Sequence, residues 1–179
     1  FGYQSKELGI KESINRISKK AGRITQIAKV IGDFLSEPDV LEGSLTSGWG
    51  GIRNPEIIKY IMYEYEMKLR DQSGLHSLSP YHEFRENFEV EHLVPKNAEA
   101  GHKLQDHWEN KHRIGNLAVL SSEQNKSKGN AAFEDKYREI YEDSSLKLLR
   151  QLDGPNFSVH KIRDREEKQL LPFIKERWG

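Results

Sequence analysis

The 179-residue sequence contains no cysteine. This absence excludes a disulfide framework, a zinc site built on thiolates and a thiol nucleophile, and it fits a protein that works in a reducing compartment. No apolar stretch approaches the roughly 20 residues needed to span a bilayer. An initiating methionine is also lacking, because the chain begins at Phe1. We therefore expect the chain to be an excised piece of a longer protein.

The sequence has no excess of charge of either sign. Lys and Arg together number 28, as do Asp and Glu, so the formal net charge is zero. Basic residues are nevertheless concentrated locally, with a net charge of +5 over residues 1–30 and +3 over residues 111–128. Phosphate binding depends on such local stripes more than on total charge. The stripes indicate either a DNA-contacting surface or ordinary solvated helix faces, and the sequence leaves both interpretations open.

Strong helical periodicity marks the first part of the chain. Apolar residues spaced by three and four predict a long helix over about residues 6–36, with Arg16, Lys20 and Arg23 on another face of it. Asn54-Pro55 supplies an N-cap and a first-turn proline, which predicts a second helix ending near Arg70. The polar, turn-rich residues that follow suggest a boundary, and we expect a helical N-terminal part over residues 1–80.

Short strands and a helix are expected in the central part, residues 81–140. Phe88 to Val94 predicts a strand that Pro95 stops, because proline cannot donate to a β-ladder. Residues 117–120 predict a second strand, and Ser121 or Ser122 can cap a helix that carries Asn125. The predicted local order is therefore strand, irregular loop, strand and helix.

The remaining residues, 141–179, are expected to form C-terminal helices. Periodicity predicts helices at about residues 133–143 and 145–152. Ser158 is placed to cap a last helix that runs to Trp178, and Pro172 should kink or interrupt it.

The residues with the most distinctive chemistry are Glu91, His92, Asn116 and Asn125, the two asparagines being nine positions apart. The imidazole of His92, with an ordinary pKa of about 6.5, suits a general base near neutral pH. The carboxylate oxygen of Glu91 and the amide oxygen of Asn125 are hard ligands, which favour Mg²⁺ or Mn²⁺ over zinc. Asn116 can bond backbone across the loop and fix the orientation of His92. The set predicts a metal-assisted phosphodiesterase, although each residue alone would more often have a structural role.

Three histidines at intervals of five, His102, His107 and His112, superficially suggest a metal cluster. This spacing does not stack side chains on one helix face, and no cysteine is present, so we expect no zinc site there. Contact with substrate or phosphate by one of them is a better expectation. Trp108, like Phe133 and Trp178, is more typical of a core residue than of a platform for base stacking.

Together these residues resemble the C-terminal HNH-type nuclease domain of the GmrSD-type restriction enzymes, which belongs to the ββα-metal nucleases. The likeness covers about residues 55–178 and is carried by a core set of residues and by two flanking stretches. The core set is Val90 to Pro95, Trp108, Ile114 to Leu120, Asn125, Lys128, Phe133 and Lys136. The flanking stretches are Ile58 to Met62 before the core and Ile162, Arg165, Leu170 and Arg177-Trp178 after it.

The resemblance implies a mostly helical fold around a small ββα-metal core, in which an antiparallel hairpin and a helix pack among several helices. It implies that Glu91 is the acidic metal ligand, His92 the general base, Asn116 the orienting middle residue and Asn125 the second metal ligand. Asn125 stands where many relatives have a histidine. The family also implies an upstream nucleotide-hydrolysing, DNA-sensing domain and defence of a bacterium against phage, often directed at modified DNA.

We therefore expect a bacterial, cytoplasmic, Mg²⁺- or Mn²⁺-dependent DNA endonuclease or nickase. DNA contacts are expected from Lys111, Arg113, Lys126, Lys128, Arg16, Lys20 and Arg23. Two alternatives stay open. One is a DNA-binding or oligomerisation module with a decayed site, and the other is an RNA nuclease, which the same chemistry permits.

Overall fold

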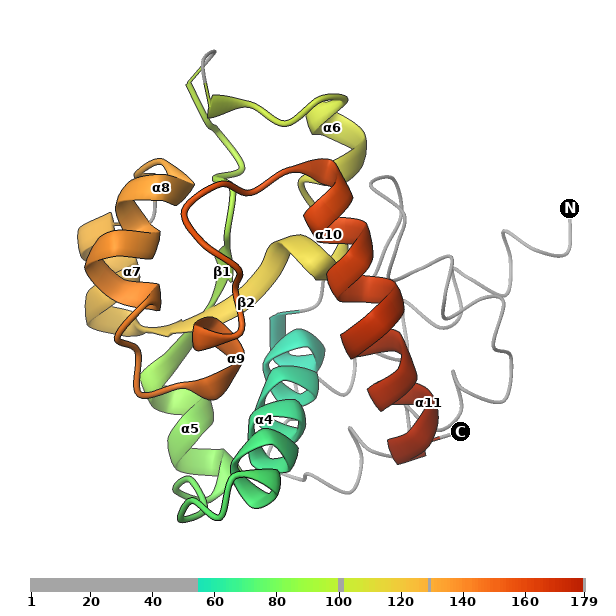
Figure 1. Cartoon of the computed structure of the whole chain (residues 1–179). Coiled ribbons are helices and arrows are strands. Elements are labelled where there is room, and N and C mark those ends of the chain that lie inside the picture. The colour runs from blue at the N-terminus through green and yellow to red at the C-terminus, as the bar shows by residue number, and fades with distance from the viewer. Residues whose placement is uncertain (1–54, 100–101, 129, 179) are drawn as a thin grey trace, which may run out of the picture.

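The structure is a computed structural model that describes residues 55–99, 102–128 and 130–178, and the basic first helix expected over residues 6–36 lies outside this part of the chain. The described part is mostly helical, with one two-stranded antiparallel sheet (Figure 1). The helices before and between the strands are α4 (Pro55–Gln72), α5 (Tyr81–Asn87), α6 (His107–Asn110) and the 3₁₀ turn η2 (Ile114–Asn116). The strands are β1 (Phe88–His92) and β2 (Leu117–Ser121). After β2 come α7 (Ser122–Lys128), α8 (Phe133–Lys136), the π-helical turn η3 (Tyr137–Tyr141), α9 (Lys147–Arg150), α10 (Val159–Arg165), the π-helical turn η4 (Glu166–Leu170) and α11 (Leu171–Trp178).

Both predicted strands are present and pair with each other. Phe88 lies opposite Ser121 at one end of the sheet, and His92 lies opposite Leu117 at the other. One further bond continues the ladder, from the amide of Leu93 to the carbonyl of Asn116, at 2.9 Å. Every side chain of β2 up to Leu120 is buried, so the sheet lies inside the molecule and holds the end of β1 in a fixed place.

The helix that carries Asn125 follows β2 directly, as the sequence predicts. The hydroxyl of Ser121 accepts a bond from the amide of Gln124, at 3.2 Å, and the Gln124 side chain accepts one from the amide of Ser121, at 3.4 Å. This reciprocal arrangement is a capping box, which fixes where α7 starts. The helix packs against both strands, so the chain order of strand, strand and helix is also a packed unit.

Helix α4 confirms the predicted apolar stripe. It begins at Pro55, and its buried residues include Ile57, Ile58, Ile61 and Met62. The expected boundary near residue 80 coincides with the turn between α4 and α5, yet α4 packs against both strands of the sheet. The α4 helix therefore contributes to the same core as the strands.

The C-terminal segments α10 and η4 pack against η2, the turn that leads into β2. Ser158 caps α10 by accepting a bond from the amide of Lys161, at 3.4 Å, as predicted. The α-helical bonding is interrupted just before Pro172, as predicted, by the turn η4, whose wider i to i+5 bonding accommodates the missing amide and the bulk of the ring. The buried side chain of Arg165 donates to the carbonyls of Gly115, at 2.9 Å, and Leu117, at 2.7 Å. Within the described residues, no helix combines the length and apolar character needed to cross a membrane.

Candidate active site

The loop that returns from β1 to β2 is held by the buried side chain of Asn116. Its amide oxygen accepts a bond from the amide of Val94, at 2.9 Å, and its amide nitrogen donates to the carbonyls of Val94, at 3.1 Å, and Lys111, at 2.9 Å. Asn116 has no exposed surface. It ties the residues just after His92 to those just before β2, which is the backbone bonding across the loop that the sequence suggested.

Glu91 lies in the protein interior and is 3% exposed. Its Oε1 atom accepts a bond from the Nζ atom of Lys136 and one from the hydroxyl of Tyr141, the latter at 3.3 Å. Lys136 also donates to the carbonyl of His92, at 2.8 Å. Burial raises the pKa of Glu91, and the neighbouring Lys136 ammonium acts against that shift. The expected acidic metal ligand is thus paired with a buried cation of the protein itself.

Asn125 is bonded to the carboxylate of Glu89, which lies in β1 two positions before the expected acidic ligand Glu91. Its amide nitrogen donates to Oε2 of Glu89, at 2.7 Å. Because side chains alternate along a strand, Glu89 and Glu91 leave β1 on the same face. Sequence reasoning missed Glu89, although this alternation was a signal that could have identified it.

The donor chemistry of this face fits a hard divalent cation. Glu89, Glu91 and Asn125 supply carboxylate and amide oxygens, the ligands that Mg²⁺ and Mn²⁺ prefer. Among the described residues no group of three His, Cys, Asp or Glu side chains gathers in a way that would hold a metal. The ammonium of Lys136 competes with any cation for Oε1 of Glu91.

His92 extends from the end of β1 on the face opposite to Glu91 and meets a second histidine. Its Nε2 atom lies 3.2 Å from Nδ1 of His112, and the two rings meet edge to face with centroids 5.2 Å apart. Burial lowers the pKa of His92 to about 3, and electrostatic interactions with His112 and nearby lysines add to this shift. The expected ordinary pKa of about 6.5 is therefore wrong for this environment, and His92 is neutral at pH 7.

Among the described residues, no group of three His, Cys, Asp or Glu side chains that could hold a metal includes the loop histidines. His107 is structural, because its Nε2 atom bonds the carbonyl of Lys96, at 3.1 Å, and its Nδ1 atom accepts from the amide of Leu104, at 3.4 Å. These bonds fasten α6 to the segment that follows β1. His102 is exposed.

The expectation that Trp108 belongs to the core is wrong. Its side chain is 69% exposed, whereas Phe133 is buried and Trp178 packs partly against the core. The Nζ atom of Lys111 lies over the Trp108 ring, 3.5 Å from its centroid, in a cation–π contact. The site loop therefore presents an aromatic ring to solvent, whereas Lys111, an expected DNA contact, is buried at 4% exposure.

The expected DNA-contacting cations have different surroundings. Arg113 binds the buried carboxylate of Glu166 through Nε, at 3.0 Å, and Nη2, at 2.5 Å. Lys128 pairs with Glu139 at 2.6 Å, and Lys126 is exposed on α7. Arg16, Lys20 and Arg23 lie outside the described residues.

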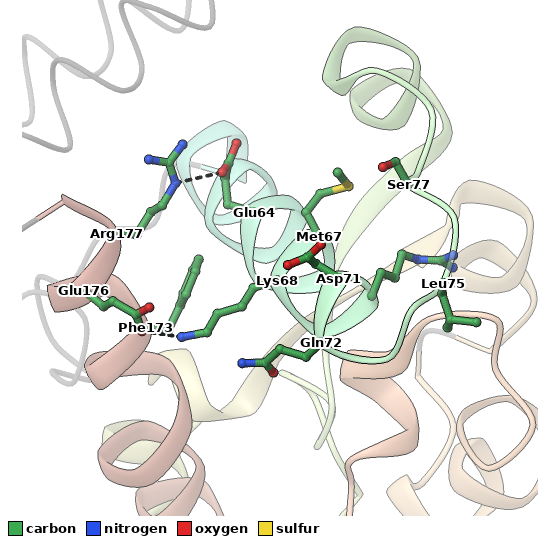
Figure 2. Close-up of a pocket in the computed structure, with 11 residues that line it drawn as sticks. Glu64, Met67, Lys68, Asp71, Gln72, Leu75, Ser77, Phe173, Glu176 and Arg177 are labelled. Atoms are coloured by element: carbon green, nitrogen blue, oxygen red, sulfur yellow. Dashed lines mark hydrogen bonds and ion pairs between the residues drawn. The ribbon is translucent and has the colours of Figure 1, made fainter.

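A hollow of about 580 Å³ lies away from these residues, between α4 and α11 (Figure 2). Two ion pairs lie within its lining, Arg177 with Glu64 at 3.1 Å and Lys68 with Glu176, and a third lining cation, Arg70, is bonded to Glu66. Paired charges of this kind leave little net attraction for a phosphate. The catalytic chemistry is therefore expected at the end of β1 and not in this hollow.

Comparison with known proteins identifies one family. The family model described as the C-terminal domain of GmrSD restriction endonucleases matches residues 48–170, which include both strands, α7 and all four of the residues predicted to form the site. No curated protein and no solved structure matches the chain.

Proposed function

Because the chain belongs to the family of GmrSD restriction endonuclease C-terminal domains, we propose that it is a metal-dependent DNA endonuclease or nickase of the HNH type. One observation carries the proposal. The Glu91-His92 pair stands at the end of β1, Asn116 is buried in the connection to β2, and α7 brings Asn125 against the strands. This is the order and packing expected of a ββα nuclease core.

In the proposed reaction His92 is the general base. A water molecule attacks phosphorus opposite the 3′ oxygen, and its proton passes to the neutral imidazole as the new P–O bond forms. The bond from phosphorus to the 3′ oxygen breaks, which leaves a 5′ phosphate. The lowered pKa of His92 keeps the ring unprotonated and ready to accept at pH 7, at the cost of weaker basicity.

Glu91 and Asn125 are proposed to hold Mg²⁺ or Mn²⁺, with Glu89 as a third oxygen donor on the same face. A bound cation would supply electrostatic stabilisation of the phosphate oxygens and the departing oxygen. The residues themselves must first rearrange, since Glu91 has to exchange its bond with Lys136, and Asn125 has to give up the bond from its amide nitrogen to Glu89 and present its amide oxygen instead.

DNA is the proposed substrate. The exposed ring of Trp108 offers a stacking surface, with the buried Lys111 packed against it, and exposed Lys126 adds basic character on α7. Arg16, Lys20 and Arg23 are proposed to add phosphate contacts. A phage or modified DNA target, an upstream nucleotide-hydrolysing sensor domain and a bacterial cytoplasmic setting complete the proposal.

A second candidate is a non-catalytic DNA-binding module. The buried Glu91–Lys136 ion pair favours it, because Glu91 could not bind a metal ion if it stayed paired with Lys136.

Nicking of supercoiled plasmid separates the two. We expect the chain to convert supercoiled plasmid to open circles with Mg²⁺ or Mn²⁺, and the His92→Ala variant to lose about 100-fold or more of that rate, as for removal of a general base. His82→Ala, an exposed histidine on α5, is the matched control. Equal rates for the parent and His92→Ala would remove His92 from the mechanism, and DNA binding without cleavage under either metal would favour the module. A parallel assay on labelled RNA tests the ribonuclease alternative.

A further inference from the structure

His112 is the neighbour of the proposed base, although neither the family nor the sequence pattern assigns it a role in the reaction. The 3.2 Å separation of His92 Nε2 and His112 Nδ1 is a hydrogen-bond distance. A neutral imidazole has one nitrogen that donates and one that accepts. The bond to His112 therefore decides which nitrogen of His92 is left to act on water.

His112 is held in this place by fixed neighbours on both sides. The carbonyl of Lys111 is bonded by Asn116, at 2.9 Å, and the guanidinium of Arg113 is bonded by buried Glu166. The carboxylate of Glu166 also accepts a bond from the amide of Gly115, at 3.2 Å. The segment around His112 therefore has little freedom to withdraw from His92.

Two placements of the shared hydrogen can be compared. If His112 donated to Nε2 of His92, the hydrogen of neutral His92 would sit on Nδ1, and neither nitrogen would be left to accept a proton from water. If Nε2 of His92 donates to His112, the lone pair of His92 lies on Nδ1. Only the second placement is compatible with His92 as a base.

We propose that His112 is a positioning residue that accepts a hydrogen bond from Nε2–H of His92 and thereby keeps Nδ1 of His92 as the basic nitrogen. This inference rests on the proposed function, in which His92 takes the proton of the attacking water. The water proton goes to Nδ1, and Nε2–H stays bonded to His112 throughout. The bond becomes charge-assisted once His92 is an imidazolium, which stabilises the product of proton transfer.

The test compares two substitutions of similar size in the full chain. His112→Gln keeps an acceptor for His92, whereas His112→Leu removes it. We expect His112→Leu to lower the single-turnover rate of plasmid nicking about 10–100-fold, as for loss of a group that orients another, with DNA affinity changed less than about twofold. His112→Gln should recover most of the rate. His82→Leu is the control for a remote histidine.

Nitrogen NMR of the histidine rings distinguishes a positioning role of His112 from a purely structural one, because only a positioning role determines which nitrogen of His92 carries the hydrogen. The His92 signals, assigned by comparison with His92→Ala, should show the Nε2–H form in the parent and in His112→Gln, and a mixture of both forms in His112→Leu. Circular dichroism melting of each variant checks that it is folded. Unchanged His92 signals in folded His112→Leu, or a loss confined to DNA affinity, would overturn the inference and make His112 a substrate contact. Wild-type cleavage by His92→Ala would instead overturn the proposed function, so the two failures are distinguishable.

Discussion

At the scale of single residues, the environment of His92 makes the metal-free protein sensitive to acid. Burial, then His112, Lys96, Lys136 and Lys111, lowers the pKa of His92 to about 3, against about 6.5 in an unfolded chain. Between these values the unfolded state binds more protons, so the free energy of unfolding should fall as the pH drops from 6.5 towards 3. Above pH 6.5, His92 does not make the free energy of unfolding depend on pH.

Urea unfolding in the presence of a chelator, followed at several pH values, measures this effect. In the His92→Gln variant the slope between pH 6 and 4 should be smaller by about 1 kcal/mol per pH unit, since one pKa unit corresponds to about 1.4 kcal/mol. An identical slope in the parent and the variant would mean that His92 is protonated in the folded protein.

Lys136 provides a second prediction at this scale, because it competes with a cation for Glu91. Lys136→Met removes the ammonium and leaves the buried Glu91 carboxylate without its charge partner. We expect the metal-free variant to be less stable by about 3–5 kcal/mol, as for other broken buried pairs. The rise in Tm on adding Mn²⁺ should be larger than in the parent, and no response of the variant to Mn²⁺ would argue against a cation at Glu91.

At the scale of elements, the approach of η2 to α10 is the tightest constraint. A Cβ atom built on Gly115 would lie 2.1 Å from the carbonyl oxygen of Ile162 and 2.9 Å from the Cγ atom of Glu166. Close packing of the two backbones therefore requires glycine at position 115. Gly115→Ala should destabilise the protein by about 3 kcal/mol or more, since overpacking against backbone cannot relax easily.

Thermal melting measures that loss. Gly154→Ala provides a contrast, because a Cβ at Gly154 meets no atom within 4 Å and only the positive φ of 71° opposes it. A smaller loss for Gly115→Ala than for Gly154→Ala would contradict the packing argument.

The elements that could be predicted from the sequence are those set by local signals. β1 and β2 follow from short apolar runs bounded by Pro95 and Ser121, and α7 follows from its capping residues. The contacts that change the interpretation of the site join residues far apart in the chain. His92 meets His112 across 20 positions, and Glu91 meets Lys136 across 45. No local periodicity encodes such pairs, which is why the partner of each proposed site residue had to come from the structure.

The solvent exposure of Trp108 could not be predicted from the sequence either. An isolated tryptophan is usually placed in a core because of its large apolar surface. Here α6 has only one turn, and its buried residues are the polar His107 and Asn110, which bond loop backbone. These bonds orient the helix so that Trp108 faces solvent.

At the scale of the whole molecule, a net charge of zero predicts weak DNA binding that depends on local surfaces. Affinity for a duplex oligonucleotide should fall steeply with added salt. Trp108→Ala should weaken binding by about 1–3 kcal/mol if the ring stacks on a base, whereas Leu75→Ala, an exposed apolar residue in the turn after α4, should leave it unchanged. Fluorescence anisotropy at several salt concentrations makes the comparison, and an affinity that ignores ionic strength would contradict the electrostatic part of the account.

The proposal that Glu91 and Asn125 bind one divalent cation is tested most directly by diffraction from crystals grown with Mn²⁺, using its anomalous signal. We predict one strong peak within bonding distance of oxygens from both residues, with the Lys136 ammonium moved away from Glu91. A peak bound elsewhere, with Lys136 still bonded to Glu91 at saturating Mn²⁺, would contradict the account.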